Sequence, residues 1–259
     1  MAQMLFDQAG KRFYHTGVAN LALFVIAGAN DTKPTAPTIG STTIDQSLYQ
    51  EGVAWDGITS ATNSPSGGDE TELWADNIKY GSMRAAEKSG GSLECYQFPE
   101  EFWPCNGAVI KNGVVVGQQA RKKFAFAYKT NVGNDQSSDA GEILHLVWNS
   151  STNPSEHQSQ TINDSPDAGT FSFEYSSDSV AYTKSVYAND PDLKPCSTME
   201  INTATLTNGK NNANYKDLLA IIYGRDADST ASPAVEAIEP QMPSPDTVLD
   251  IMSRALPSG

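Results

Sequence analysis

Three segments of the chain place a heavy apolar side chain at every second residue, a period that suits one face of a β-strand. The alternating residues are Phe124, Phe126 and Tyr128, then Leu144, Leu146 and Trp148, then Phe171, Phe173 and Tyr175. Turn-rich stretches separate these segments. Strands arranged in this way predict an antiparallel sandwich or barrel rather than alternating strands and helices.

Shorter strand-like runs precede these three segments. They are Phe13 to Ile26, Gly52 to Ser64, Leu73 to Tyr80 and Ser92 to Phe98, with a short helical turn at Pro99 to Phe102. The Ser/Pro/Gly turn at 64–68 predicts that the second and third runs form a hairpin. Asn112-Gly113 tolerates positive φ and predicts another hairpin between 108–111 and 114–117.

Two segments have the pattern of an amphipathic helix, Ala213 to Tyr223 and a second one that begins after Ser244 and ends near Arg254. Residues 226–243 between them are acidic and rich in Ala and Pro, which predicts a linker. We therefore expect a mainly β fold (β-rich α+β) of two packed antiparallel sheets with one flanking helix. Its domain covers 1–225, including an N-terminal arm (1–12) and a long loop (27–52), and 226–259 form the linker and C-terminal helix.

The chain is acidic, with a net charge of −14. Affinity for nucleic acid comes mainly from Lys and Arg side chains that displace counterions from phosphates, so this charge disfavours specific DNA binding. An acidic surface suits a concentrated soluble protein, or a passage through which a polyanion moves without adhering. Hydrophobic residues make up 39% of the chain, which is enough for a packed core.

The residues that usually carry catalysis or bind metals do not form a recognisable motif. The histidines (His15, His145 and His157) are scattered, and no nucleophile elbow is present. Asp226 and Asp228 resemble the start of a calcium loop that lacks its glycine and terminal glutamate. The three cysteines (Cys95, Cys105 and Cys196) have neither metal nor disulfide spacing, and we expect them to be reduced thiols. We expect no enzyme activity, no cofactor and no metal.

Four short motifs occur in a set order along the chain. They are Leu73-Trp74-Ala75-Asp76-Asn77 followed by Tyr80, Tyr96-Gln97-Phe98-Pro99-Glu100-Glu101-Phe102 with Cys105, Phe124-Ala125-Phe126-Ala127-Tyr128-Lys129, and Thr161-Ile162-Asn163-Asp164-Ser165-Pro166. In this order and with these spacings, roughly residues 55–225 resemble the major tail protein, or tail tube protein, of long-tailed, non-contractile bacteriophages.

The resemblance implies a structural virion protein. Copies would form hexameric rings that stack into the tail tube, the conduit for DNA ejection, after assembly in the host bacterial cytoplasm. The implied partners are other copies of the chain, the tape measure protein, the tail terminator and the distal tail proteins. DNA would pass through the lumen without specific binding, and no membrane is involved. The candidate arms between subunits are 1–12, 27–52, 64–80 and the segment after 225.

Aromatic residues cluster between 74 and 103 and suit either the core or contacts between subunits. Our candidates for inter-subunit contacts are Trp74, Tyr80, Phe98, Phe102 and Trp103. Glu174 alternates with the apolar residues of its strand, together with Ser172 and Ser176, so it faces either the lumen or the outside of the tube.

Two hypotheses from other classes remain open. In the first, the chain is a secreted carbohydrate-binding β-sandwich that uses Trp55 or Trp148 as a sugar platform. This requires the apolar run 18–29 to be a signal segment cleaved near Ala29, although Asn20 interrupts it and the same residues also predict a strand. The second hypothesis is a glycosidase, which requires two carboxylates at working distance in a cleft.

Overall fold

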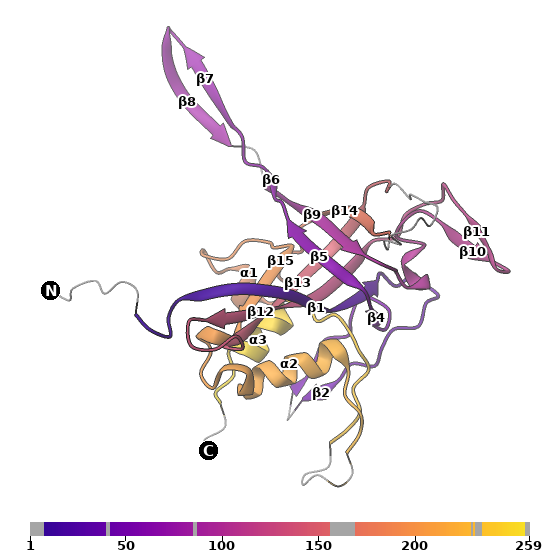
Figure 1. The fold of residues 1–259 in the computed structure, drawn as a ribbon. Helices are drawn as coiled ribbons and strands as arrows, with labels where there is room; N and C mark the ends of the chain where they lie inside the picture. The colour runs from indigo at the N-terminus through magenta and orange to yellow at the C-terminus, as the bar shows by residue number, and fades with distance from the viewer. Residues whose placement is uncertain are drawn as a thin grey trace, which may run out of the picture.

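The structure is a computed structural model that describes residues 8–39, 42–84, 87–155, 169–228, 230 and 235–256. Its centre is a nine-stranded antiparallel sheet with the order β4-β1-β12-β13-β14-β9-β5, to which β15 adds beside β13 and β6 beside β9 (Figure 1). Three two-stranded hairpins accompany it. The prediction of a mainly β fold is therefore confirmed. The motif at 161–166 and His157 lie outside the described residues.

The sheet forms two layers because β13 (Gly141–Thr152) changes its neighbour along its length. Its first half pairs with β15 (Thr198–Asn202), and its last three residues pair with β14 (Phe171–Ser177). Asn149 lies between the two regions with φ 52, which turns the strand from one layer to the other. The first layer is completed by β12 (Phe124–Asn134), β1 (Phe13–Val25) and β4 (Val53–Trp55), and the second by β9 (Glu87–Cys95), β5 (Ile58–Asn63) and β6 (Ser66–Gly67).

The first layer carries buried apolar residues on both of its faces, whereas the alternation predicts one heavy apolar face for each strand. Phe124, Phe126 and Tyr128 point into the space between the two layers. Ala125 and Ala127 of β12, with Leu144, Leu146 and Trp148 of β13, point to the opposite side, where α2 (Ala213–Tyr223) and α3 (Pro245–Met252) cover them. The aromatic rings of β12 thus help to fill the gap between the layers, while its alanines leave room for the larger side chains of the helix side.

The long loop and the C-terminal segment pack on the body of their own chain. The loop 27–52 contains the short hairpin β2 (Thr38–Ile39) and β3 (Thr42–Thr43) and buries Ile39, Ile44 and Tyr49. Ile238, Met242, Val248 and Ile251 join the same hydrophobic cluster from the C-terminal side. These two segments are therefore parts of the core rather than free arms.

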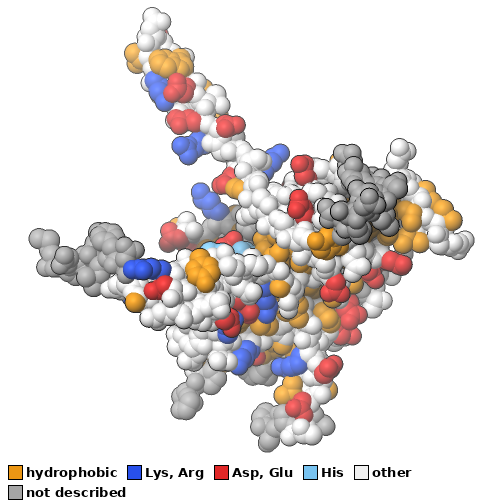
Figure 2. Space-filling model, in the orientation of Figure 1, with side chains coloured by type: hydrophobic (Ala, Val, Ile, Leu, Met, Phe, Trp, Pro, Cys, Tyr) orange, Lys and Arg blue, Asp and Glu red, His pale blue; other side chains and the backbone are white. Residues whose placement is uncertain are grey.

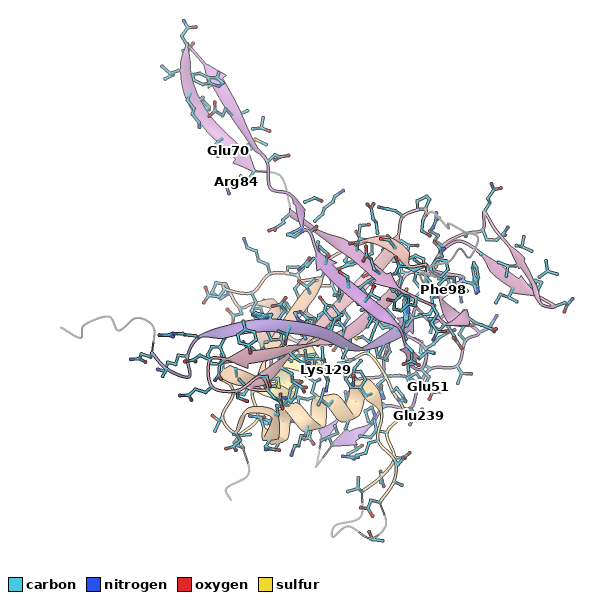
Figure 3. The ribbon with its side chains drawn as sticks, viewed as in Figure 1. Glu51, Glu70, Arg84, Phe98, Lys129 and Glu239 are labelled. Carbon is cyan, nitrogen blue, oxygen red and sulfur yellow. The ribbon has the colours of Figure 1, made fainter. Side chains whose placement is uncertain are left out.

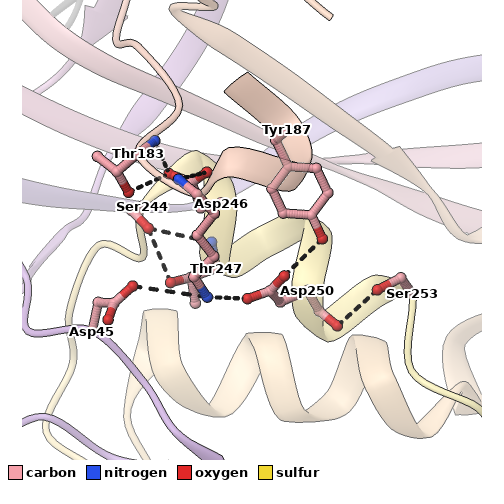
Figure 4. A network of polar contacts seen from close by, with 9 residues as sticks. Asp45, Thr183, Tyr187, Ser244, Asp246, Thr247, Asp250 and Ser253 are labelled. Carbon is pink, nitrogen blue, oxygen red and sulfur yellow. Dashed lines mark hydrogen bonds and ion pairs between the residues drawn. The ribbon is translucent and has the colours of Figure 1, made fainter. Parts of the chain in front are cut away.

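A polar network fixes α3 to the short helix α1 (Ser185–Ala188), as Figure 4 shows. The buried carboxylate of Asp246 accepts hydrogen bonds from the Thr183 amide (2.9 Å), the Thr183 hydroxyl (3.0 Å) and the Lys184 amide (3.2 Å). Asp250 pairs with Lys184 and accepts a hydrogen bond from the Tyr187 hydroxyl at 2.7 Å. A buried carboxylate needs such partners, and these place the last helix at one position on the fold.

Two strand predictions in the N-terminal half are wrong. The run 52–64 forms two strands, β4 and β5, because the chain breaks at Asp56-Gly57, where Gly57 has φ +84. It does not form a hairpin with 73–80. Instead β5 pairs with β9, and the run 73–80 folds on itself. The hairpin predicted at Asn112-Gly113 is confirmed by β10 (Val109–Lys111) and β11 (Val114–Val116).

Candidate assembly surfaces

A long hairpin projects from the body of the molecule (Figure 1). Its strands are β7 (Glu70–Ala75) and β8 (Ile78–Arg84), and we call residues 70–84 the ribbon hairpin. The turn forms at Asp76 and Asn77, whose φ angles are 50 and 62, because Asp and Asn tolerate this left-handed conformation. This dipeptide is the sequence signal for the turn, and it divides the run 73–80 that the apolar pattern predicts as one strand.

One face of the ribbon hairpin is charged and internally paired. Lys79 Nζ lies 2.7 Å from a carboxylate oxygen of Glu72 and 3.5 Å from one of Glu70, and an Arg84 nitrogen lies 3.7 Å from Glu70. The Trp74 indole N–H donates to Glu72 at 3.1 Å. Glu70 and Arg84 mark the base of this face in Figure 3. Exposed pairs of this kind contribute little stability, but they orient the side chains on one side of the hairpin.

The other face of the ribbon hairpin is apolar. Thr71, Leu73 and Ala75 lie opposite Met83, Gly81 and Ile78 in the register of the two strands, and these six residues form the apolar face. Leu73, Ile78 and Met83 are all exposed, Ile78 by 63%. Figure 2 shows apolar side chains gathered at the far end of the hairpin, with charged ones along its stem. Exposed apolar patches of this kind mark protein contacts.

The five predicted contact residues fall into two groups. Trp74 and Tyr80 are 65% and 77% exposed on the ribbon hairpin, so they are free to contact another molecule. Phe102 is 1% exposed, and the centroid of its ring lies 4.6 Å from that of Trp55. Its prediction as a contact residue is therefore wrong, because the turn after β9 points this ring into the space between the layers.

Phe98 and Trp103 flank that buried ring at the edge of the core. Both are half-buried, with their ring centroids 4.9 Å apart, and Phe98 also lies 5.8 Å from Phe102. Figure 3 places Phe98 in the body, away from the ribbon hairpin. Both rings therefore pack in part against their own chain.

The hairpin β10–β11 is a second exposed apolar element, which we call the valine hairpin (109–116). Val114, Val115 and Val116 are all exposed, Val114 by 61%. The register places Val114 opposite Lys111 and Val116 opposite Val109, so these four side chains share one face. The valine and ribbon hairpins leave the body in different directions (Figure 1).

The outer face of the second layer is polar and carries the predicted Glu174. In the register of the strands, Glu174 lies opposite Ser92 of β9, which in turn lies opposite Thr62 of β5. Ser172, Glu94 and Ser60 are aligned across the same three strands in the same way. Glu174 and Glu94 are exposed, and hydroxyl side chains surround them. The face that alternates with the apolar residues of β14 is thus a flat surface of hydroxyls and carboxylates.

Three polar side chains form a chain of hydroxyl, imidazole and carboxylate, the order found in a catalytic triad. The Thr130 hydroxyl lies 2.9 Å from Nε2 of His145, whose Nδ1 lies 3.1 Å from a carboxylate oxygen of Glu200. The Tyr128 ring stacks on the imidazole, with the two ring centroids 4.5 Å apart. Burial lowers the pKa of His145 below its usual value, although Glu200 acts in the opposite direction and His15 in the same direction as burial. These contacts hold the imidazole ring in one orientation.

The two fully buried cysteines have raised pKa values, which disfavour the reactive thiolate form. Burial raises the pKa of the Cys95 thiol to about 11 and that of Cys105 to about 12, so both are protonated at neutral pH. Within the described ranges, no three His, Cys, Asp or Glu residues are placed to hold a metal ion. Of the helices described, none is long and apolar enough to cross a membrane.

The two tryptophans proposed as sugar platforms are both core residues, so that prediction is wrong. Trp55 is 2% exposed and donates its indole N–H to the Gln97 carbonyl at 2.8 Å, and Trp148 is 1% exposed and donates to the Pro243 carbonyl at 2.8 Å. Residues 18–25 of the apolar run form the second half of β1, and the last five of them are buried. Cleavage after Ala29 would remove that strand from the middle of the first layer.

Comparison with known protein families finds no matching family model, and no curated protein matches the sequence.

Proposed function

We propose that this chain is a structural subunit whose copies assemble into stacked hexameric rings and form the tail tube of a long-tailed bacteriophage. The observation that carries the proposal is the ribbon hairpin, because its apolar face extends away from the core of its own chain. An isolated two-stranded hairpin is marginally stable in water, so contact with another molecule would stabilise this one.

The polar face of β14, β9 and β5 supports the role of a tube wall. In the proposed assembly this face lines the lumen, and Glu174 and Glu94 present negative charge to the passing DNA. At about 0.1 M salt, repulsion between exposed charges acts over a distance of about 10 Å. Hydroxyl and carboxylate groups would let DNA pass without specific binding, because they lack the cations that hold phosphates.

The proposal also defines the partners and the location. The chief partner is the chain itself, through one contact that closes a ring and another that continues along the axis. The tape measure protein, the tail terminator and the distal tail proteins would meet the tube in the virion tail, after assembly in the cytoplasm of the host. The protein would be no enzyme.

Negative-stain electron microscopy of the concentrated, purified protein tests this proposal. We expect rings or tubes of uniform width, with light scattering that shows a rise in mass with protein concentration. A protein that remains monomeric at every concentration would count against the proposal. A turnover rate on a small substrate that disappears with one point substitution would overturn it.

A further inference from the structure

We infer that the apolar face of the ribbon hairpin docks on the valine hairpin of a second copy of this chain. The inference rests on the proposed self-association and names the two surfaces that meet. On one copy they are Leu73, Ile78 and Met83, and on the other they are Val109, Val114 and Val116. Each set lies on one face of a two-stranded hairpin, so the two hairpins can lie flat against each other.

The charges near the two hairpins are complementary. Residues 69–84 carry four acidic and two basic side chains, whereas 105–123 carry four basic and no acidic ones, in a chain whose net charge is −14. Asp76 lies in the ribbon hairpin and Asp69 directly precedes it, while Lys111 lies in the valine hairpin and Arg121 follows it. Within the described part of the chain, none of these four side chains takes part in a salt bridge. Attraction between these groups favours pairing of unlike hairpins over pairing of like ones.

The direction of the two hairpins decides what such a contact builds. They leave the body on different sides (Figure 1), so the contact is heterologous: each copy offers one surface to one neighbour and the other surface to the next. A heterologous contact repeats until it closes into a ring or continues as a filament. The pair of hairpins can therefore join copies into a polymer.

The backbone of the apolar face leaves room for a partner. Gly81 lies opposite Leu73 in the middle of this face, and among the described residues no atom lies within 4 Å of the position that a Cβ would take there. The apolar face therefore carries no side chain between Leu73 and Met83. A valine side chain from a second copy is small enough to fill such a space.

Cysteine crosslinking between two differently labelled variants tests the pairing. Ile78→Cys and Val114→Cys replace exposed residues, whereas the native Cys95 and Cys105 are buried and protonated. A Cys196→Ser background removes the half-buried third thiol. After mild oxidation at a concentration that supports assembly, we expect disulfide-linked dimers in the mixture of the two variants and in neither variant alone. Ser82→Cys, on the charged face of the ribbon hairpin, is the matched control and should give no dimer with Val114→Cys.

The other outcomes separate this inference from the proposed function. Rings or tubes without a crosslink between positions 78 and 114 would overturn the pairing and leave the tube intact. Dimers of Ile78→Cys with itself would show that like hairpins meet, which also overturns it. If unmodified protein forms no assembly at any concentration and the mixture gives no crosslink, the pairing and the proposed function both fail.

Discussion

At the scale of single residues, position decides whether an aromatic side chain serves the core or the surface. Phe102 is enclosed by Trp55, Phe124 and Phe173, with ring centroids 4.6, 5.7 and 4.8 Å away. Trp74 lies on the ribbon hairpin and is 65% exposed. We expect Phe102→Ala to lower the free energy of unfolding by about 3 to 5 kcal/mol, because it opens a cavity between the layers. Trp74→Ala should change it by no more than about 0.5 kcal/mol.

Urea denaturation followed by circular dichroism measures both effects. Trp74→Ala is the matched control, since it also removes a large aromatic ring. Equal losses of stability in the two variants would show that the ring of Trp74 packs as tightly as that of Phe102. The alternation within regular strands predicted the buried faces of β12, β13 and β14 correctly. It gave no guide to Phe102, because a short turn has no period that separates its buried side from its exposed side.

His145 makes the stability depend on pH. Burial lowers its pKa in the folded protein, so the unfolded chain, where the pKa is about 6.5, takes up a proton first as the pH falls. The free energy of unfolding therefore decreases below about pH 6.5, by at most about 1.4 kcal/mol per pH unit, until the pH has passed below the folded pKa. Urea denaturation of wild type and His145→Gln between pH 7.5 and 4.5 measures this contribution.

The difference between the two proteins reports the contribution of His145 together with its electrostatic effect on Glu200 and His15, because the other titrating groups are common to both. Its ring faces Glu200, Tyr128 and Thr130, with His15 near enough to act on its charge. We expect the stability of His145→Gln to fall less steeply than that of wild type below pH 6.5. Parallel curves would show that this histidine has the same pKa in the folded and unfolded states.

At the scale of secondary structure, the two faces of the ribbon hairpin should respond differently to the same charge. Gly81→Glu adds a carboxylate to the apolar face, at a position where a Cβ meets no atom of the described residues within 4 Å apart from its chain neighbours. Ser82→Glu places it one residue further, on the face of Glu72. Burying an unpaired carboxylate in a contact is costly, so we expect Gly81→Glu to raise the concentration needed for assembly at least about tenfold. Ser82→Glu should change it by less than about threefold.

Light scattering as a function of protein concentration measures this onset. Both variants should unfold at the temperature of wild type, since neither residue contributes to the core. A result in which both variants assemble like wild type would show that the apolar face stays in solvent. If Ser82→Glu blocks assembly as strongly as Gly81→Glu, the charged face is the one that makes contact.

The hairpins also show how far local sequence determines an element. Asn112-Gly113 predicted the valine hairpin correctly, because both residues favour the required positive φ. The ribbon hairpin carries a similar signal at Asp76-Asn77. The apolar pattern of residues 73–80 nevertheless predicts a single strand across this turn. The edge strand β15 was not predicted at all. Its five residues pair with β13 more than fifty residues away, so tertiary contacts rather than local pattern form it.

At the scale of the whole molecule, the apolar stripe of α3 predicted that the helix is buried but not which surface covers it. The structure shows it against α2, in the same cluster as the first layer. The two-layer arrangement follows from β13, whose change of neighbour at Asn149 is not evident from its alternation. Periodicity gives the faces of each strand, whereas the pairing of strands depends on contacts distant in sequence. The candidate surfaces depend on that pairing and needed the structure.

The charge of the polar face gives a prediction for the assembled tube. Glu94→Lys with Glu174→Lys changes the charge of each subunit by +4, and in the proposed assembly a ring of six subunits would place twelve added lysines around the lumen. Lysines there would attract phosphates that the wild-type carboxylates repel. Both side chains are exposed and neither belongs to the ribbon hairpin or the valine hairpin, so assembly should proceed as in wild type. We expect virions with the double variant to eject DNA at least about tenfold more slowly, and added salt to reduce the difference by screening.

Fluorescence of a DNA-binding dye during triggered ejection measures the rate, and Glu94→Gln with Glu174→Gln separates loss of repulsion from new attraction. Equal ejection rates for all three would place this face on the outside of the tube.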